Sequence, residues 1–163
     1  MKRLILMRHA KSSWDDPMLG DHERPLNGRG RISADALGDW LRAKLYAPDQ
    51  ALVSDSARTR ETFARLNFIC DTSFASALYH ASPRTMIEVL KGAKGDTVLM
   101  VGHNPGIAEF AGQIVAQPPD HMRFYDYPTC ATTVMEFDID DWSELRAGTG
   151  RVLDFVIPRE ITP

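Results

Sequence analysis

Two histidines each follow an apolar run that is typical of a buried strand. His9 comes directly after Arg8 at the end of the run Leu4–Met7, and His103 follows the run Thr97–Gly102. An unprotonated imidazole nitrogen can attack phosphorus without a separate base to activate it. A guanidinium beside it offers a planar fork of donors that fits two phosphate oxygens. These residue types therefore indicate a phosphate pocket with a nitrogen nucleophile.

A third set of polar residues stands between a short apolar run and an amphipathic segment. Gln50–Val53 is followed by small polar residues at 54–56, which suit a helix N-cap, and Arg58 would lie in the first turn of that helix. The backbone N–H groups and the dipole at such a helix start favour an anion. Arg60, two residues further along, points to a different face, and we expect it to be solvated. Arg58 would thus add a second guanidinium to the pocket.

Each of these features also has a plain structural explanation, such as a capping arginine or a surface histidine after a strand. A pair such as Arg-His matches by chance, and alone it would favour that explanation. The three strand ends, however, would lie on one edge of a parallel sheet, where open α/β sheets bind ligands. That concurrence favours a phosphate site built from Arg8, His9, Arg58 and His103.

The elements that must position these residues alternate between strand and helix. The expected strands are Leu4–Met7, Gln50–Val53, Thr97–Gly102, Thr132–Phe137 and Val152–Ile157, and the expected helices are Asn27–Leu45, a segment ending near Leu66, one beginning at Ser82-Pro83 and one beginning at Asn104-Pro105. Residues 12–26 are turn-rich and indicate a loop. This order predicts an α/β fold with three layers, in which a mostly parallel central sheet is flanked by helices on both faces.

The composition limits the other classes of function. The chain has 163 residues, about the length of one domain, and we expect residues 1–163 to form a single domain. Its net charge of −3 supplies no overall basic field for nucleic acid or an anionic membrane, so neither is expected as a partner. The N-terminal apolar run is interrupted at Arg8 and is too short for a signal peptide or membrane helix, which favours a cytoplasmic protein. Nothing in the sequence indicates an oligomeric state.

Cysteine and histidine spacing gives no sign of a metal site. Cys70 and Cys130 are isolated, and we expect both to be buried free thiols. The five histidines lack a metal-ligand spacing, so no metal is expected. Outside the pocket, we expect His22 and His121 to be solvated and Trp14 to anchor a loop or line the rim of the site.

The motifs resemble those of the histidine phosphatase superfamily. That family carries Arg-His after its first strand, Ser-x-x-x-Arg-x-x-x-Thr at a helix start and a second histidine after a later strand. The matching residues here are Arg8-His9, Ser54 with Arg58 and Thr62, and Gly102-His103. Its SixA-like branch is also similar in three longer strings: Arg-His-Ala-Lys-Ser-Ser-Trp at 8–14, Arg24-Pro25-Leu26-Asn27-x-x-Gly30, and Leu78-Tyr79-x-Ala81-Ser82-Pro83.

The resemblance implies a phosphatase that needs no metal or organic cofactor. His9 would attack phosphorus and become phosphorylated, and water would then release phosphate. Arg8, Arg58 and His103 would hold the phosphoryl oxygens, because catalysis of phosphoryl transfer is mostly positioning and electrostatics. Arg24 would border the pocket or pair with Asp21.

The chain departs from the family pattern at two points. Ala10 replaces the usual glycine after Arg-His, a change small enough to fit. Larger members also supply a carboxylate, as general acid, from the region that here corresponds to residues 77–81, which holds no Asp or Glu. This absence favours a labile leaving group, and protein phosphohistidine is the substrate class of the SixA-like branch. Asp21 or His80 could replace the acid, and Glu88 has no clear role.

Two alternatives stay open at this point. The chain could be a hydrolase of a small phosphomonoester, or a mutase, although it is short for the insertions that a mutase uses to close its site. From a different class, it could be a non-catalytic module that binds phosphate or phosphohistidine. The expected partner of the chain is accordingly a phosphorylated protein or a small phosphomonoester.

Overall fold

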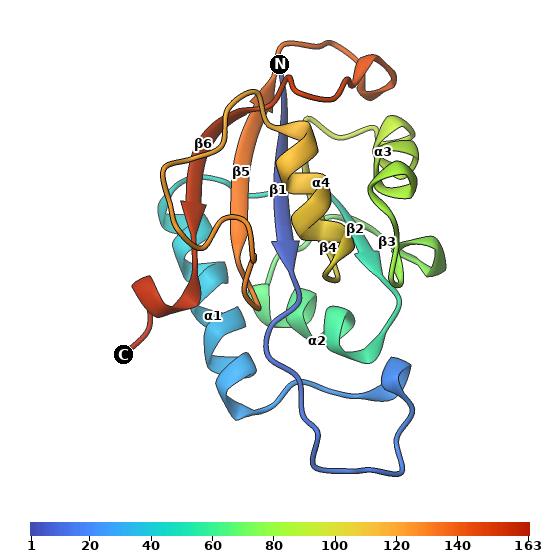
Figure 1. Ribbon diagram of the computed structural model, residues 1–163, viewed down its shortest axis with the longest axis vertical. Helices are drawn as coiled ribbons and strands as arrows, with labels where there is room; N and C mark the ends of the chain where they lie inside the picture. Colours follow the sequence, from blue (N-terminus) through green and yellow to red (C-terminus); the bar gives the residue numbers. More distant parts are fainter.

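A computed structural model describes all residues 1–163 and contains one six-stranded sheet with four α-helices (Figure 1). The strands are β1 (Lys2–Arg8), β2 (Gln50–Ser54), β3 (Asp71–Ala75), β4 (Thr97–Gly102), β5 (Thr132–Phe137) and β6 (Arg151–Val156), and the helices are α1 (Gly28–Ala43), α2 (Ala57–Leu66), α3 (Pro83–Lys91) and α4 (Gly106–Ile114). Four short 3-10 helices, η1 (Asp21–Glu23), η2 (Ser76–Leu78), η3 (Trp142–Glu144) and η4 (Pro158–Glu160), lie in the connections.

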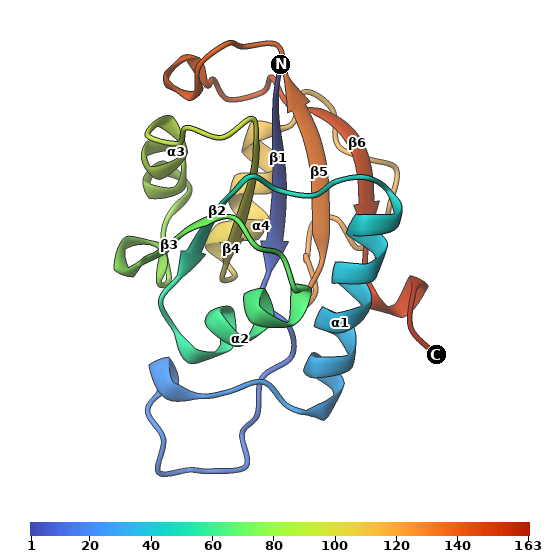
Figure 2. The same ribbon diagram turned by 180° about the vertical axis from the view of Figure 1, so that it is seen from behind.

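The sheet is mostly parallel, as predicted. Its strand order is β3-β2-β4-β1-β5-β6, and the first four strands in this order are parallel to one another. Only β5 runs in the opposite direction, antiparallel to both β1 and β6. Helices α3 and α4 cover one face of the sheet and α1 and α2 cover the other (Figures 1 and 2). The predicted three-layer α/β fold is therefore confirmed.

The apolar run in β1 faces both layers. Leu4 and Leu6 belong to the core beneath α3 and α4, whereas Ile5 and Met7 belong to the core beneath α1 and α2. Successive side chains of a strand point to opposite faces, so a strand covered on both sides reads as a continuous apolar run. This central position fixes the end of β1, and with it the segment that begins at Arg8.

Side-chain caps start three of the helices where the sequence predicts. Asn27 accepts a hydrogen bond from the Gly30 backbone N–H at 2.8 Å, and Ser56 and Ser82 cap α2 and α3 in the same way. The start of α1 also packs closely against the chain after β1. A Cβ added at Gly30 would lie 2.1 Å from the carbonyl oxygen of Lys11, so only glycine fits there.

Strand β3 was not predicted. It is short and polar, its side chains are mostly exposed, and it pairs only with β2 at one edge of the sheet. Its pairing carries the chain back to the carboxyl edge, where η2 is followed by Tyr79 and His80. The strand thus positions two residues that line the site described below.

Several smaller expectations can also be compared with the structure. Helix α1 ends at Ala43, two residues before the expected end, and Leu45 adopts a left-handed φ of 63°. Cys130 is buried as predicted, but the expectation for Cys70 is wrong because it follows α2 near the open edge of the sheet and stays half-exposed. No helix is both long and apolar enough to cross a membrane.

Candidate active site

The carboxyl edge of the sheet holds a pocket of about 530 Å³. The structure brings together there all five residues that the sequence pointed to: Arg8, His9, Arg24, Arg58 and His103 all line the pocket. The loop after β1, blue in Figure 1, runs beneath the ends of the strands and closes one side. With His80, three arginines and three histidines thus face one cavity in a protein with a net charge of −3.

The backbone around His9 sets its tautomer. The His9 N–H donates to the Gly102 carbonyl at 3.0 Å, which ties the end of β1 to β4. Its ring Nδ1 lies 2.7 Å from the carbonyl oxygen of Ala10. Because a carbonyl oxygen only accepts, Nδ1 carries the proton and Nε2 keeps its lone pair. Burial lowers the pKa of His9 to about 3, so the ring is neutral near pH 7.

His103 lies beside His9 and is also neutral. The two ring centroids are 5.2 Å apart. Nε2 of His103 lies 2.8 Å from Oγ of Ser54, the last residue of β2, and Nδ1 lies 3.4 Å from the Arg58 guanidinium. Burial, followed by the neighbouring His9, lowers the pKa of His103 to about 2. The ring is therefore held between two strand ends and the start of α2.

Arg58 is only 2% exposed and lies in the first turn of α2, as the sequence predicts. Its Nη1 donates to the Asp21 carbonyl at 2.7 Å, and its Nη2 donates to the Asp21 carboxylate at 3.0 Å. Thr62 joins this turn to β1, because its Oγ1 accepts from the Ala10 N–H at 3.0 Å and donates to the Arg58 carbonyl at 2.7 Å. These contacts hold the guanidinium in one place.

Arg8 extends from the other side of His9. Its Nη1 donates to the carbonyl oxygen of Tyr127 at 3.2 Å, which also accepts from Asn104 Nδ2 at 3.0 Å. The Nε atoms of both Arg8 and Arg58 are buried and have no hydrogen-bond partner in the protein. Arg3, outside the pocket, has a buried Nε of the same kind, but only Arg8 and Arg58 also line the pocket, where their guanidinium groups can bind an anion.

The loop at residues 12–26 supplies the carboxylate of Asp21, one of the two candidates for the acid. Asp21 accepts hydrogen bonds from the Tyr79 hydroxyl and from His80 Nε2, the latter at 3.1 Å. The hydrogen bond from Tyr79, followed by those from His80, Arg58 and Arg24, holds the pKa of Asp21 well below its usual range. An ionised Asp21 has no proton to give, which leaves His80 as the candidate acid in the pocket.

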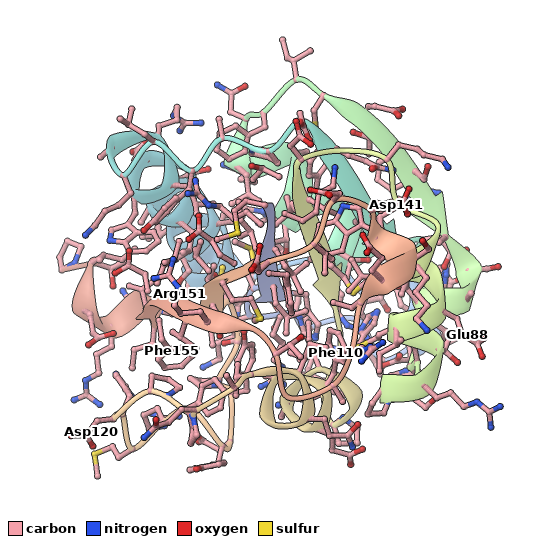
Figure 3. The ribbon with its side chains drawn as sticks, turned by 90° about the horizontal axis from the view of Figure 1, so that it is seen from above. Glu88, Phe110, Asp120, Asp141, Arg151 and Phe155 are labelled. Carbon is pink, nitrogen blue, oxygen red and sulfur yellow. The ribbon has the colours of Figure 1, made fainter.

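Glu88 lies away from the pocket. Its side chain is exposed on α3 and pairs with Arg84 at 3.6 Å across one helical turn. Figure 3 shows Glu88 at the outer side of α3. The structure thus gives Glu88 no contact with the other residues of the site.

Arg24 does both things that the sequence left open. It pairs with Asp21 at 3.1 Å and lines the pocket, with its Nη1 2.6 Å from Ser12 Oγ. Its guanidinium carbon lies 3.5 Å from the ring centroid of Trp14, a cation–π contact on a ring that is 76% exposed. Trp14 therefore lines the rim of the site.

The expectation that His22 and His121 are solvated is only partly confirmed, because each ring also contacts a carboxylate. His22 Nε2 lies 2.9 Å from Oδ1 of Asp55, because the loop folds back onto the residues before α2. His121 Nε2 lies 3.3 Å from a carboxylate oxygen of Glu160. Both rings are half-buried. No group of three or more His, Cys, Asp and Glu side chains in the protein is arranged to hold a metal ion.

The two buried histidines should make stability depend on pH. Unfolding returns their pKa values from about 3 and about 2 to near 6.5, so the unfolded chain binds protons that the folded chain does not. The free energy of unfolding should therefore fall as pH drops from 6.5 towards 4.5, by at most about 1.4 kcal/mol per pH unit for each histidine.

Urea denaturation of the wild type and of His103→Gln at several pH values checks this expectation. The variant should lose about half of the slope. The window stays above pH 4.5 because the lowered pKa of Asp21 adds its own loss of stability below about pH 4. Unfolding free energies that do not change with pH in this window would contradict two neutral, buried rings.

Comparisons with known proteins agree with the motifs. The model of the histidine phosphatase superfamily (branch 1) matches residues 4–74. An uncharacterized protein of Mycobacterium tuberculosis is 33% identical over 160 residues, which cover 94% of this chain and all of the relative. An uncharacterized protein of Mycobacterium leprae is 29% identical over 162 residues, with 94% of this chain and all of the relative covered.

Solved structures extend the likeness to the whole chain. SixA from Nakamurella multipartitia is 26% identical with a TM-score of 0.84, and the match covers 96% of each chain. SixA from Agrobacterium tumefaciens is 26% identical with a TM-score of 0.76, covering 96% of this chain and 98% of that one. The protein histidine phosphatase SixA, solved with tungstate, shares the fold at 18% identity and a TM-score of 0.78, with 98% and 99% covered.

Proposed function

The chain belongs to the SixA-like branch of the histidine phosphatase superfamily, and we propose that it is a phosphatase in which His9 is transiently phosphorylated. The observation that carries this proposal is the state of His9. Its Nδ1 proton is held by the Ala10 carbonyl and its pKa is about 3, so Nε2 is a free nucleophile at neutral pH. Three arginines surround the same pocket.

The reaction has two displacements at phosphorus. In the first, the Nε2 lone pair of His9 forms an N–P bond while the bond to the leaving group breaks, and the leaving group takes that electron pair and a proton. In the second, the oxygen of a water molecule attacks phosphorus and the P–N bond breaks. The electron pair returns to His9, the water proton passes to solvent, and inorganic phosphate leaves.

The arginines would take the place of a metal ion. Arg8 and Arg58 line the pocket and are held by hydrogen bonds to the protein, so each guanidinium can donate to phosphoryl oxygens from a fixed position. His103 would support the transferring group from its position next to Arg58. Under this proposal the enzyme needs neither a metal nor an organic cofactor.

The groups around the leaving atom favour a substrate that needs little acid help. Asp21 is ionised by its contacts and has no proton to give, so His80, whose Nε2 lies 3.1 Å from Asp21, is the remaining candidate for the acid. Phosphohistidine has a labile P–N bond, whereas an alkyl phosphate leaves poorly without an acid. We therefore place a phosphohistidine-bearing protein first among substrates. A small phosphomonoester is the second candidate.

Turnover of matched substrates tests this function. We expect kcat/KM for a phosphohistidine peptide to exceed that for sugar phosphates by at least about tenfold. The reason is that only phosphohistidine has a leaving group that departs readily without an acid from the enzyme. A chelator added to the assay should not lower the rate. Faster turnover of sugar phosphates would reverse the substrate order. Phosphate binding without turnover of any substrate would instead identify a non-catalytic module.

A further inference from the structure

A second hollow, of about 580 Å³, lies next to the catalytic pocket. Lys11 and Thr129 line both cavities, so the two share a wall. The other walls come from the first turns of α1, the segment 123–129 and the chain from η4 to its end. We call this cavity the basic hollow, after the residues described next.

Four cations face the basic hollow: Lys11, Arg29, Arg123 and Arg159. Arg123 is paired with Asp126 at 3.0 Å. The other three form no ion pair, and Arg29 only donates to the Thr162 hydroxyl at 3.1 Å. Like charges gathered without counter-ions repel one another, so an anion in their midst would be stabilised. This concentration is local, since the whole chain carries a net charge of −3.

The walls of the basic hollow are held by backbone contacts. The Asn27 N–H donates to the Lys11 carbonyl at 3.0 Å, and the missing side chain at Gly30 lets α1 press against the same carbonyl. On the far side, the Thr162 N–H donates to the Pro158 carbonyl at 2.9 Å. Cations on such fixed backbone lose less entropy when they bind than cations on a mobile loop.

The residues around the two cavities fit a protein better than a small molecule. Trp14 and Met18, on the loop over the catalytic pocket, are 76% and 89% exposed. Met122 and Tyr125, in or next to the segment that lines the basic hollow, are 90% and 68% exposed. Aromatic residues, methionine and arginine are the types enriched where proteins bind one another. A small phosphomonoester in the catalytic pocket could contact Trp14, but it would leave Met18, Met122 and Tyr125 uncovered, because these three line neither cavity.

We propose that the basic hollow is a second anion subsite, which holds an acidic side chain of the phosphorylated protein while its phosphoryl group lies against His9. This inference rests on the proposed function, because it takes the neighbouring pocket as the site of phosphoryl transfer. It adds a specificity rule: acidic residues close to the phosphohistidine should be preferred over neutral ones.

The double substitution Arg29→Gln with Arg159→Gln removes two of the unpaired cations. The matched control is Arg84→Gln with Lys91→Gln, which removes two exposed cations from α3. Two phosphohistidine peptides are compared, one with flanking Glu and one with Gln at the same positions, together with para-nitrophenyl phosphate. The hollow variant should raise KM for the acidic peptide about five- to tenfold and leave kcat unchanged, whereas the control should change neither.

The other measurements separate this proposal from the proposed function. The hollow variant should turn over para-nitrophenyl phosphate normally and lose the preference for the acidic peptide, and the preference of the wild type should shrink at high salt. A wild type without any preference, or a variant that keeps it, would overturn the subsite. Binding of a small alkyl bisphosphate is measured as well. If the hollow variant loses affinity only for this compound and not for the acidic peptide, the occupant is a small molecule and the proposal is overturned.

If the wild type does not turn over phosphohistidine at all, the proposed substrate fails and the subsite is still tested. Binding of the two peptides to His9→Asn, with and without the two hollow substitutions, can be measured by fluorescence anisotropy. The subsite predicts tighter binding of the acidic peptide, lost with the cations. Equal binding of both peptides would overturn it.

Discussion

Replacing His9 with alanine should lower kcat by at least about a thousandfold, because it removes the only atom placed to form the covalent intermediate. The Nε2 lone pair of His9 is kept free by the Ala10 carbonyl on the other ring nitrogen. His103 cannot take over easily, since its Nε2 lies 2.8 Å from Ser54 and its Nδ1 faces the Arg58 guanidinium. Phosphate release under saturating substrate measures the loss.

The phosphorylated enzyme can also be trapped, and this shows which histidine forms the bond to phosphorus, which activity alone does not. Quenching the wild type during turnover should trap an acid-labile phosphoryl group on His9 and none on His103. His121→Ala is the control, because this histidine is half-buried and hydrogen-bonded but lies outside the pocket. Thermal melting of each variant shows that it is folded. Turnover that survives in His9→Ala, or an adduct on His103, would contradict the mechanism.

The strand ends of the site could be predicted because their signals are local. An apolar run that stops at Arg8-His9, and another that stops at Gly102-His103, each mark the end of a buried strand. A parallel sheet then brings such ends to one edge, whatever the details of packing. The same logic placed Arg58, since Ser56 caps the helix that carries it.

The remaining parts of the site depend on contacts far apart in the sequence. Asp21 lies in a segment without a periodic pattern. It precedes Arg58 by 37 residues in the sequence, and only folding brings its carboxylate to 3.0 Å from the Arg58 guanidinium. Tyr79 and His80 are brought to the site because β3 precedes them in the chain, and the polar sequence of β3 does not predict a strand. The motif comparison looked for the carboxylate after the second strand and helix, whereas the structure supplies one from before the first helix.

The expectation of a solvated His22, only partly confirmed, failed for the same reason. A histidine in a polar loop is usually solvated, but this loop folds onto the start of α2, where Asp55 accepts its hydrogen bond. A hydrogen bond between two loop residues leaves no periodic trace in a sequence. The same argument applies to the basic hollow, whose cations come from four separated segments of the chain.

Replacing Arg58 with alanine should lower kcat/KM by about a hundred- to a thousandfold. The guanidinium is 2% exposed, carries a buried Nε without a protein partner and faces the same pocket as His9. Charge that develops on the phosphoryl oxygens is stabilised most by donors that are already fixed and desolvated. Arg58→Lys keeps the charge but loses the planar fork, so it should recover only part of the loss.

Arg60→Ala is the matched control for this position. Arg60 lies two residues further along the same helix, but its side chain is exposed, donates to the Asp55 carbonyl at 2.9 Å and lies over Phe74. Removing it should change kcat/KM by less than about twofold, since a solvated cation outside the pocket contributes little. Asp21→Asn should reduce activity less than Arg58→Ala, because Arg58 keeps its bond to the Asp21 backbone carbonyl. Equal losses in the Arg58 and Arg60 variants would mean that general positive charge near α2, and not the fork aimed into the pocket, drives catalysis.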